Sequence, residues 1–195
     1  MQMSYLKITE YEIVPVESFS VIRNCSGCGK KAHFTNTGKF RVNANGSKLD
    51  VWLIYQCENC KHTFNLTIFE RRKVSSLPQA EYLCFLNNDK KTAEMYGRDI
   101  RLFRKNRAEI DFERLKYQFI RLPDHPEERA SEDRIILTIH NPCECKIRPE
   151  KQIAGVWGIS TSRVRKMLRD GELELWNVSP RSVSVRACQE SFPWI

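Results

Sequence analysis

Two pairs of cysteines place the strongest constraint on the fold. Cys25 and Cys28 form one Cys-x-x-Cys pair, Cys57 and Cys60 form a second, and 28 residues lie between the pairs. Tetrahedral zinc needs ligand sulfurs at ~2.3 Å, and a two-residue spacer lets one turn supply two of them. Each pair lies at a turn beside an expected strand, so the two turns can meet at one end of a sheet. The spacing therefore predicts a structural zinc ion in a zinc ribbon, with four protein ligands and no open position for a substrate.

Other uses of these thiols are weaker interpretations. A redox pair needs only one Cys-x-x-Cys, and no βαβ pattern surrounds either pair. Iron is another metal that four thiolates bind, and His33 or His62 could replace one cysteine as a ligand. Cys84 shares a helical face with leucines and is expected to be a core thiol. A second metal site is an open alternative for the remaining candidates, which are His140, Cys143, Cys145 and Cys188.

The composition narrows the class of protein. The chain has 195 residues with 32 Lys and Arg against 24 Asp and Glu, a formal net charge of +8, and 41% hydrophobic residues. This is enough apolar material for one large or two small folded domains, which excludes global disorder. No apolar stretch approaches the ~18 to 20 residues of a membrane span, and the N-terminus lacks a basic region followed by an apolar block. We therefore expect a cytoplasmic protein without a membrane partner.

The first half of the chain has the alternation of β-strands. Apolar and polar residues alternate over residues 39–44 and 49–55, on either side of the turn pair Asn45-Gly46. This pattern predicts a hairpin that delivers the second cysteine pair, followed by a last strand at 63–70. Residues 5–16 are expected to form an N-terminal strand of the same domain. We therefore predict a zinc-ribbon β domain over residues 1–74.

The rest of the chain mixes helices and strands. From Pro78 the apolar spacing becomes helical, with Asn88 or Asp89 as a cap, which predicts a helical connector over 75–108. Residues 109–122 are ambiguous, but a strand that pairs with residues 133–141 is favoured. Helices at 150–157 and 161–170 and a strand at 172–176 complete a C-terminal module over 109–195. The predicted class is α+β: an antiparallel zinc-ribbon sheet, central helices and a small α/β module with a helix pair.

The positive charge lies at the two ends of the chain. Residues 1–74 carry 11 basic and 6 acidic residues, residues 75–146 carry 13 of each, and the last 49 residues carry 8 and 5. Such a division suits a polyanion that is contacted at two places, although a solvated basic surface is the simpler alternative. The candidate phosphate contacts are Lys30, Lys31, Lys39, Arg41, Arg71 and Arg72 on the ribbon, and Arg163, Lys166 and Arg169 on the second C-terminal helix.

The C-terminal run IAGVWGISTSRVRKMLRDGELEL resembles the small RNA-binding module of the S-four type, first described in a ribosomal protein. The resemblance rests on Ser160, Ser162, Arg163, Leu168 and Gly171. It implies a helix pair and a following strand that present serines and arginines to structured RNA. The same run is also similar to the helix-turn-helix of excisionase-type DNA binders, which implies a DNA-binding regulator.

Over most of residues 8–175 the chain resembles a bacterial family of small cytoplasmic proteins of unknown function headed by a zinc ribbon. The specific matches are FRVNANGSKLDVWLIYQC with CENC, IRNCSGCG before it and TAEMYGRDIRLFRKN after it. This resemblance implies a fold and no established activity.

Binding is the function that these observations favour. We expect a nucleic-acid-binding protein, with RNA favoured over DNA. The alternative is a protein-interaction adaptor that docks a protein partner through exposed tryptophans, whose candidates are Trp52, Trp157, Trp176 and Trp194. The sequence has no Gly-rich phosphate loop, no Gly-x-Ser-x-Gly and no His-Glu-x-x-His. Its candidate carboxylates, Asp50, Glu58, Asp99 and Asp111, are isolated and have ordinary surface explanations. We therefore expect no enzymatic activity.

Overall fold

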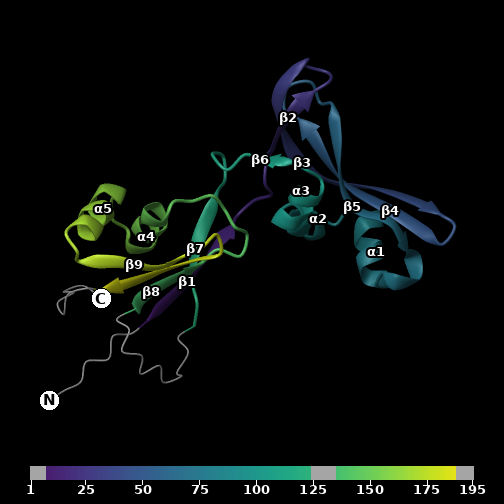
Figure 1. Ribbon diagram of the computed structural model, residues 1–195. Coiled ribbons are helices and arrows are strands. Elements are labelled where there is room, and N and C mark those ends of the chain that lie inside the picture. Colours follow the sequence, from purple (N-terminus) through teal and green to yellow (C-terminus); the bar gives the residue numbers. More distant parts are fainter. Residues whose placement is uncertain (1–7, 124–134, 188–195) are drawn as a thin grey trace. The chain divides into compact units, whose positions relative to one another are not determined.

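The computed structural model describes residues 8–123 and 135–187 and contains both sheets and helices, which confirms the α+β class (Figure 1). The chain forms two compact units. The cysteine unit is Pro15–Lys116, and the terminal unit consists of the described residues of Met1–Val14 and Tyr117–Ile195. This division differs from the one expected from composition, because the boundaries expected after residues 74 and 108 both fall inside the cysteine unit.

None of the helices that the structure describes is long and apolar enough to cross a membrane.

The cysteine unit is built on a five-stranded sheet in the order β5-β4-β3-β2-β6, in which neighbouring strands run antiparallel. Its strands are β2 (Val21–Cys25), β3 (Lys30–Asn45), β4 (Lys48–Cys57), β5 (Thr63–Lys73) and β6 (Glu109–Ile110). The predicted hairpin is present as β3 and β4. Asn45 pairs with Lys48, so the turn consists of Gly46 and Ser47, with Gly46 at a φ of +58°.

One face of this sheet carries the core of the cysteine unit. Along β4, residues 49, 51, 53, 55 and 57 are buried and the residues between them are half-exposed, which is the pattern of a sheet covered on one face. After the 3₁₀ turn η1 (Val74–Ser76), three short helices supply the cover, namely α1 (Gln79–Leu86), α2 (Lys90–Tyr96) and α3 (Ile100–Lys105). Phe85 of α1 packs edge-on against Phe40, and Phe103 of α3 packs edge-on against Tyr55. The helices expected to connect two domains are therefore part of this core.

The terminal unit has a second five-stranded sheet in the order β7-β1-β8-β10-β9. Its strands are β1 (Thr9–Pro15), β7 (Tyr117–Arg121), β8 (Ile135–His140), β9 (Leu173–Val178) and β10 (Ser182–Ala187). β1 pairs with β8 in parallel, and β10 pairs antiparallel with β8 and β9.

One domain assignment and one strand pairing expected from the sequence are therefore wrong. β1 lies in the sheet of the terminal unit and not beside the cysteines, and it separates β7 from β8, which were expected to be neighbours. Ile13 of β1 is fully buried in a core with Ile136 and Ile139 of β8. The burial of this side chain against residues more than 100 positions away determines which strand β1 pairs with. Strand alternation shows that one face is apolar but does not identify the partner strand.

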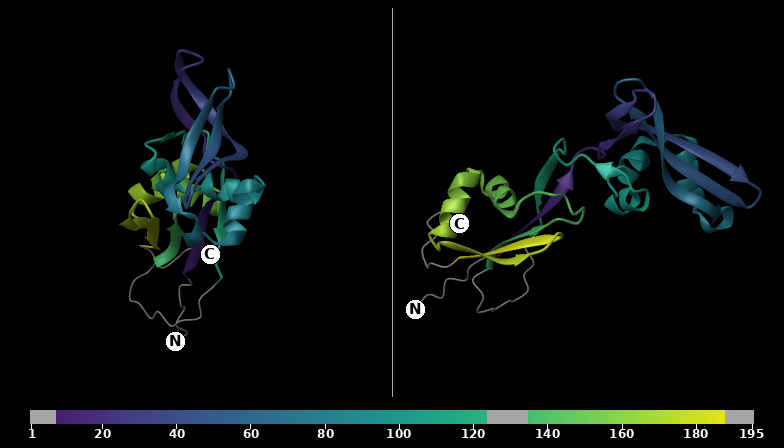
Figure 2. Two further views of the ribbon diagram at one scale, coloured as in Figure 1. Left: turned by 90° about the vertical axis from the view of Figure 1, so that its right-hand side faces the viewer. Right: turned by 45° about the horizontal axis from the view of Figure 1, so that its top comes forward.

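Helices α4 (Pro149–Trp157) and α5 (Thr161–Arg169) lie on one side of this sheet (Figures 1 and 2). Gly158 ends α4 in the left-handed conformation, and the Ser160 side chain accepts a hydrogen bond from the Arg163 amide at the start of α5. Ile153, Val164 and Met167 are buried against the sheet. The two helices end within a residue of the ranges that the sequence predicts.

The close contact between α4 and β7 generates a test of the terminal unit. A Cβ atom on Gly155 would overlap the ring of Phe119. We expect Gly155→Ala to lower the free energy of unfolding by ~1 to 2 kcal/mol, measured by urea denaturation, because the ring must move. In a Phe119→Ala background the same change should raise it by ~0.5 to 1 kcal/mol, because alanine is then only the better helix former. A loss of the same size in both backgrounds would contradict this packing.

Candidate metal centre

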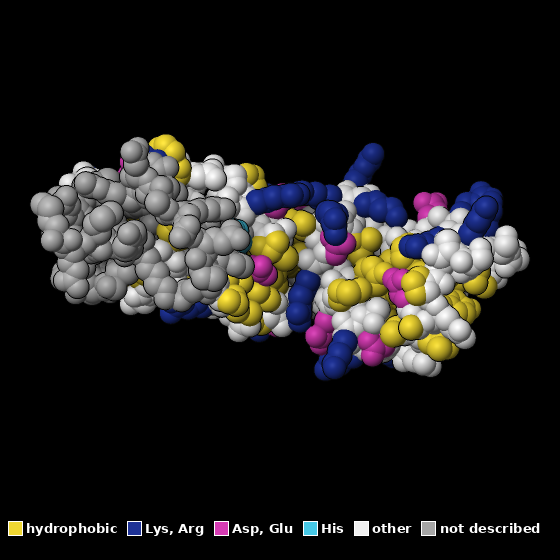
Figure 3. All heavy atoms as spheres, turned by 90° about the horizontal axis from the view of Figure 1, so that it is seen from below, with side chains coloured by type: hydrophobic (Ala, Val, Ile, Leu, Met, Phe, Trp, Pro, Cys, Tyr) yellow, Lys and Arg dark blue, Asp and Glu magenta, His cyan; other side chains and the backbone are white. Residues whose placement is uncertain are grey.

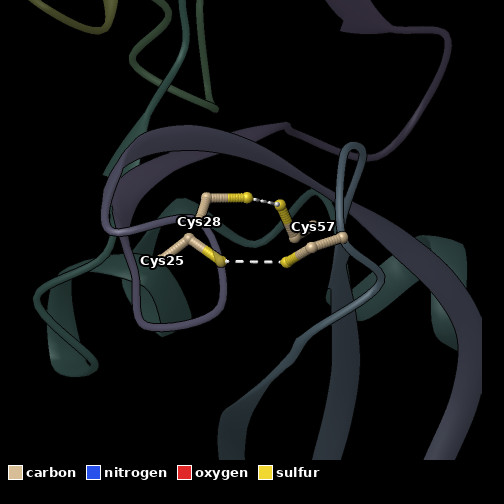
Figure 4. A group of neighbouring side chains, drawn as sticks. Cys25, Cys28 and Cys57 are labelled. Atoms are coloured by element: carbon tan, nitrogen blue, oxygen red, sulfur yellow. Dashed lines mark hydrogen bonds between the residues drawn. The ribbon is translucent and has the colours of Figure 1, made fainter.

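The four paired cysteines form one compact cluster of sulfur atoms. All four Sγ atoms lie within 4.8 Å of one another. The Sγ atoms of Cys25 and Cys60 are 3.3 Å apart, and those of Cys28 and Cys57 are 3.7 Å apart (Figure 4). Sulfurs bound at ~2.3 Å to a tetrahedral ion are about 3.8 Å apart. A Cβ on Gly27 would lie 2.8 Å from the Cys60 sulfur, so the first turn needs a glycine there. The cluster can therefore hold a metal ion.

The two turns that carry the cysteines have the same backbone conformation and hydrogen bonding. The Gly29 amide donates to the Cys25 carbonyl at 2.9 Å, and the Lys61 amide donates to the Cys57 carbonyl at 3.2 Å. Gly29 and Lys61, which follow the second cysteine of each pair, have φ values of +66° and +64°. Each turn thus folds back tightly enough to aim two sulfurs at one point. The alternating strands β2 and β4 end at these turns and bring them together.

Without a metal ion, Cys25 and Cys28 retain their protons at neutral pH. The hydrogen bond with the Cys60 sulfur and burial raise the pKa of Cys28 to about 12, and burial raises the pKa of Cys25 above its usual value. The pKa of Cys57 is lowered to about 7, chiefly because the Cys60 backbone amide donates a hydrogen bond to its sulfur. Since metal ligands are thiolates, a bound cation would take the place of these protons.

A buried carboxylate supports the second turn. Asp111, which the sequence suggested was an ordinary surface residue, is 5% exposed. Its carboxylate lies 3.1 Å from His33 Nδ1 and 3.5 Å from Arg114 Nε. Arg114 Nη1 in turn donates to both carboxylate oxygens of Glu58, at 3.1 and 3.0 Å, and the Glu58 amide donates to the His33 carbonyl. This chain of contacts fixes the residue that follows Cys57.

The histidines considered as ligands have other partners. His62 Nε2 shares a hydrogen bond with the Ser26 hydroxyl at 2.9 Å, and His140 Nε2 lies 2.6 Å from a Glu10 carboxylate oxygen. Within residues 8–123 and 135–187, the four-cysteine cluster is the one group of three or more potential ligands. The second metal site considered for His140, Cys143 and Cys145 is therefore absent from the described part of the chain. Its fourth candidate, Cys188, lies outside that part.

The candidate cations of the cysteine unit do not form one surface. Lys30 and Lys31 begin β3 beside the cysteines, and Lys31 pairs loosely with Glu109 at 3.7 Å. Arg72 lies opposite Leu49 near the far end of the hairpin, roughly 40 Å away at the usual rise of a strand. Arg41 and Arg71 belong to this far half, and Lys39 lies between the two ends.

Two of the distant arginines are engaged with aromatic rings. The Arg72 guanidinium lies 4.3 Å from the centroid of the Phe69 ring and donates to the Ser76 carbonyl. The Arg41 guanidinium lies 5.9 Å from the Trp52 ring. The cations that the charge pattern grouped together are therefore separated by the length of the sheet.

The candidate residues of α5 do lie together. Its solvent side carries Ser162, Arg163, Lys166 and Arg169, all exposed, opposite the buried Val164 and Met167. Arg165, which was not among the candidate phosphate contacts, is also exposed and flanks this side. Ser160 serves as the helix cap. We call Ser162, Arg163, Arg165, Lys166 and Arg169 the α5 face.

A groove lies in the cysteine unit beside β3. It has a volume of about 860 Å³ and includes the bulge in β3 around Gly38. Three carboxylates line it, and each is paired: Glu17 with Lys116, Glu58 with Arg114, and Glu94 with Arg98. Ion pairing accounts for these groups without a reaction.

Fold and site define an α+β protein with a four-cysteine cluster that can hold a metal ion. The family model described as "Protein of unknown function (DUF1062)" matches residues 42–178, which is more than half of the chain. The protein therefore belongs to this family. The matched range contains Cys57 and Cys60 and begins after Cys25 and Cys28. Neither a curated protein nor a solved structure matches the chain.

The cluster can be tested by removing one sulfur. We expect Cys25→Ser and Cys57→Ser each to abolish stoichiometric metal, measured by elemental analysis of the purified protein, because three sulfurs hold the ion far less tightly. Cys84→Ser is the matched control, because this half-buried thiol lies on α1 outside the cluster. Retention of one equivalent of metal by either cluster variant would contradict the assignment.

Metal affinity should also rise with pH. Cys25 and Cys28 are thiols at neutral pH, so binding must release about two or more protons per ion. Below pH 7 protonation of Cys57 adds to this number. Fewer protons have to be displaced as the pH increases, so the dissociation constant should fall between about pH 6 and 8. Competition with a chromophoric chelator measures it, and a constant value over this range would oppose the assignment.

Proposed function

We propose that this protein is a zinc-ribbon protein that binds structured RNA. The choice of zinc is supported by the donor set, because four thiolates in a tetrahedral arrangement suit Zn²⁺. Four protein ligands leave no position for a substrate, so the ion is structural. Such sites supply about 10 kcal/mol or more of folding free energy. A thiolate site also needs a reducing compartment, which supports a cytoplasmic location.

The α5 face is the observation that carries the proposal of nucleic-acid binding. Arg163, Arg165, Lys166 and Arg169 lie on nine residues of helix, and their exposed cationic groups suit the phosphates of a nucleic acid. Arg169 pairs only loosely with Asp170, at 3.9 Å. The face is held rigidly, since the opposite side of α5 is buried against the sheet. Lys30 and Lys31, beside the cysteines, offer a second set of phosphate contacts.

RNA is favoured over DNA by the order of the elements around this face. The helix pair is followed directly by β9, as in the S-four-type module that the sequence resembles. Proteins recognise folded RNA largely by its shape and backbone, which suits a small rigid surface with several cations. A DNA-binding regulator would instead place α5 in the major groove, and preference for duplex DNA would identify that alternative.

The proposal predicts how binding changes with charge and salt. In Arg163→Ala/Lys166→Ala/Arg169→Ala, affinity for a structured RNA should fall at least about tenfold, and the slope of log affinity against log salt should become shallower by about 2 to 3. Fluorescence anisotropy at several salt concentrations measures both quantities, with single-stranded and duplex DNA in parallel. Lys151→Ala, an exposed cation on α4, is the control and should bind as the wild type does.

Two outcomes would end this proposal. One is undetectable binding of the wild-type protein to all three nucleic acids at low salt. The other is unchanged affinity of the triple variant, provided that zinc content and circular dichroism show it to be folded.

A protein-interaction adaptor is the second candidate. Trp176 and Val178 of the edge strand β9 are 50% and 54% exposed, while Trp52 and Trp157 are half-buried and Trp194 lies outside the described residues. Other exposed apolar side chains belong to α1 and α2, namely Leu83, Leu86 and Met95. In the face shown in Figure 3, hydrophobic side chains of the described residues lie among charged ones. Failure of the wild-type protein to bind nucleic acid would favour this candidate.

A further inference from the structure

A small basic pocket lies in the cysteine unit and joins Lys31, a candidate phosphate contact, to two arginines that the charge pattern did not single out. It has a volume of about 370 Å³ and is bordered by β2, β5, β6 and the end of α3. Arg23, Lys31 and Arg107 are its cations, Glu109 is its carboxylate, and Phe64 supplies an aromatic wall. Arg23 and Arg107 lie more than 80 residues apart in the sequence, so their proximity comes from the fold.

Arg107 occupies a position where glycine is the usual residue. It follows the last turn of α3 with a φ of +50°, and the next amide, that of Ala108, donates back to the Phe103 carbonyl at 2.9 Å. Helices that end in this way commonly have glycine at the left-handed position, because a side chain there meets steric resistance. The Arg107 side chain therefore has a conformational cost at this position, which glycine would not have.

The backbone beside Arg107 is held firmly. Asn106 accepts a hydrogen bond from the Thr67 amide at 2.8 Å and donates one to the Thr67 carbonyl at 2.9 Å. These two bonds attach the end of α3 to β5. Arg107 is thus anchored at the border of the pocket and does not sit on a free loop.

Arg23 lies against the aromatic wall. Its guanidinium is 3.8 Å from the centroid of the Phe64 ring and 5.9 Å from that of Phe34. Stacking orients the planar group and leaves its N–H edges available for acceptors. Among the residues that the structure describes, no carboxylate pairs with Arg23 or Arg107.

These features are those of a phosphate site. Three cations face one carboxylate, and that carboxylate pairs loosely with Lys31 at 3.7 Å while both groups remain more than 60% exposed. Guanidinium groups donate paired hydrogen bonds to phosphate oxygens, and a neighbouring ring can contact the attached sugar or base.

We propose that this pocket binds a phosphate group of the RNA chain, with Arg23 and Arg107 as its main donors. The identity of this ligand rests on the proposed function, and the pocket adds a second anchoring point within the cysteine unit. The phosphate site itself depends only on the geometry of the pocket.

Arg107→Gly separates binding from stability. The variant removes the cation and gives the left-handed position its preferred residue, so its melting temperature should equal or exceed that of the wild type. Affinity for the structured RNA should fall about fivefold or more, and the salt slope should become shallower by about 0.7 to 0.9. Arg71→Gly is a closely matched control, because Arg71 is exposed, has the same φ of +50°, and lies at the far end of β5, outside the contacts that the proposed function retains. It removes the same charge and should bind within about twofold of the wild type.

Comparison of these variants tests the phosphate pocket separately from the proposed function. Loss of RNA binding in the α5 triple variant with unchanged binding in Arg107→Gly would overturn the pocket and leave the function standing. Equal losses in Arg107→Gly and Arg71→Gly would show a diffuse effect of charge and would also overturn it.

A second measurement uses no RNA. Inorganic phosphate and adenosine 5′-monophosphate are titrated at constant ionic strength into the zinc-loaded protein, and the side-chain N–H signals of Arg23 and Arg107 are followed by NMR. Saturable shifts of both signals support the site, and their absence overturns it. If the wild-type protein shows these NMR shifts but binds no RNA, the phosphate site stands and RNA is excluded as the ligand that supplies the phosphate.

Discussion

The convergence of four sulfur atoms is the constraint on which the cysteine unit depends. Two turns with the same backbone, at the ends of β2 and β4, bring the sulfurs within 4.8 Å of one another. Thiolates cannot crowd in this way without a cation, and two of the thiols accordingly have raised pKa values. The β3–β4 hairpin spans the distance between the pairs, so its register decides whether the sulfurs meet. A bound ion would stabilise this register, and buried Asp111 supports it through Arg114 and Glu58.

The distribution of cations on the surface follows from whether they lie on a strand or on a helix. The sheet separates Lys30 and Lys31 from Arg72 along its length, whereas α5 gathers its cations within nine residues. A strand spreads charges at about 3.3 Å per residue, and a helix gathers them at 1.5 Å per residue. This geometry is why the α5 face carries the proposal of binding and the basic run at the end of β5 does not. Arg23 and Arg107 show the converse, since the fold joins residues that the sequence keeps far apart.

Much of the local structure could be predicted from the sequence. Alternation located β3 and β4, helical spacing located α4 and α5, and the choice of Asn88 or Asp89 as a cap is resolved by Asp89, which accepts a hydrogen bond from the Thr92 amide. These features depend on neighbours a few residues away. The placement of β1 and the burial of Asp111 could not be predicted in the same way, because each depends on what packs against the residue from a distant part of the chain.

By itself, the sequence determined the α+β class, the four cysteines of the cluster and the basic side of α5, because residues at a fixed spacing within a turn or a helix lie on the same side of it. The tertiary structure alone decided which sheet receives β1, that the helices after residue 78 belong to the core of the cysteine unit, and that Arg23 and Arg107 border one pocket. Those outcomes depend on which apolar faces bury one another. That burial is a non-directional interaction between distant segments, and a periodic pattern shows that a face is apolar without showing its partner.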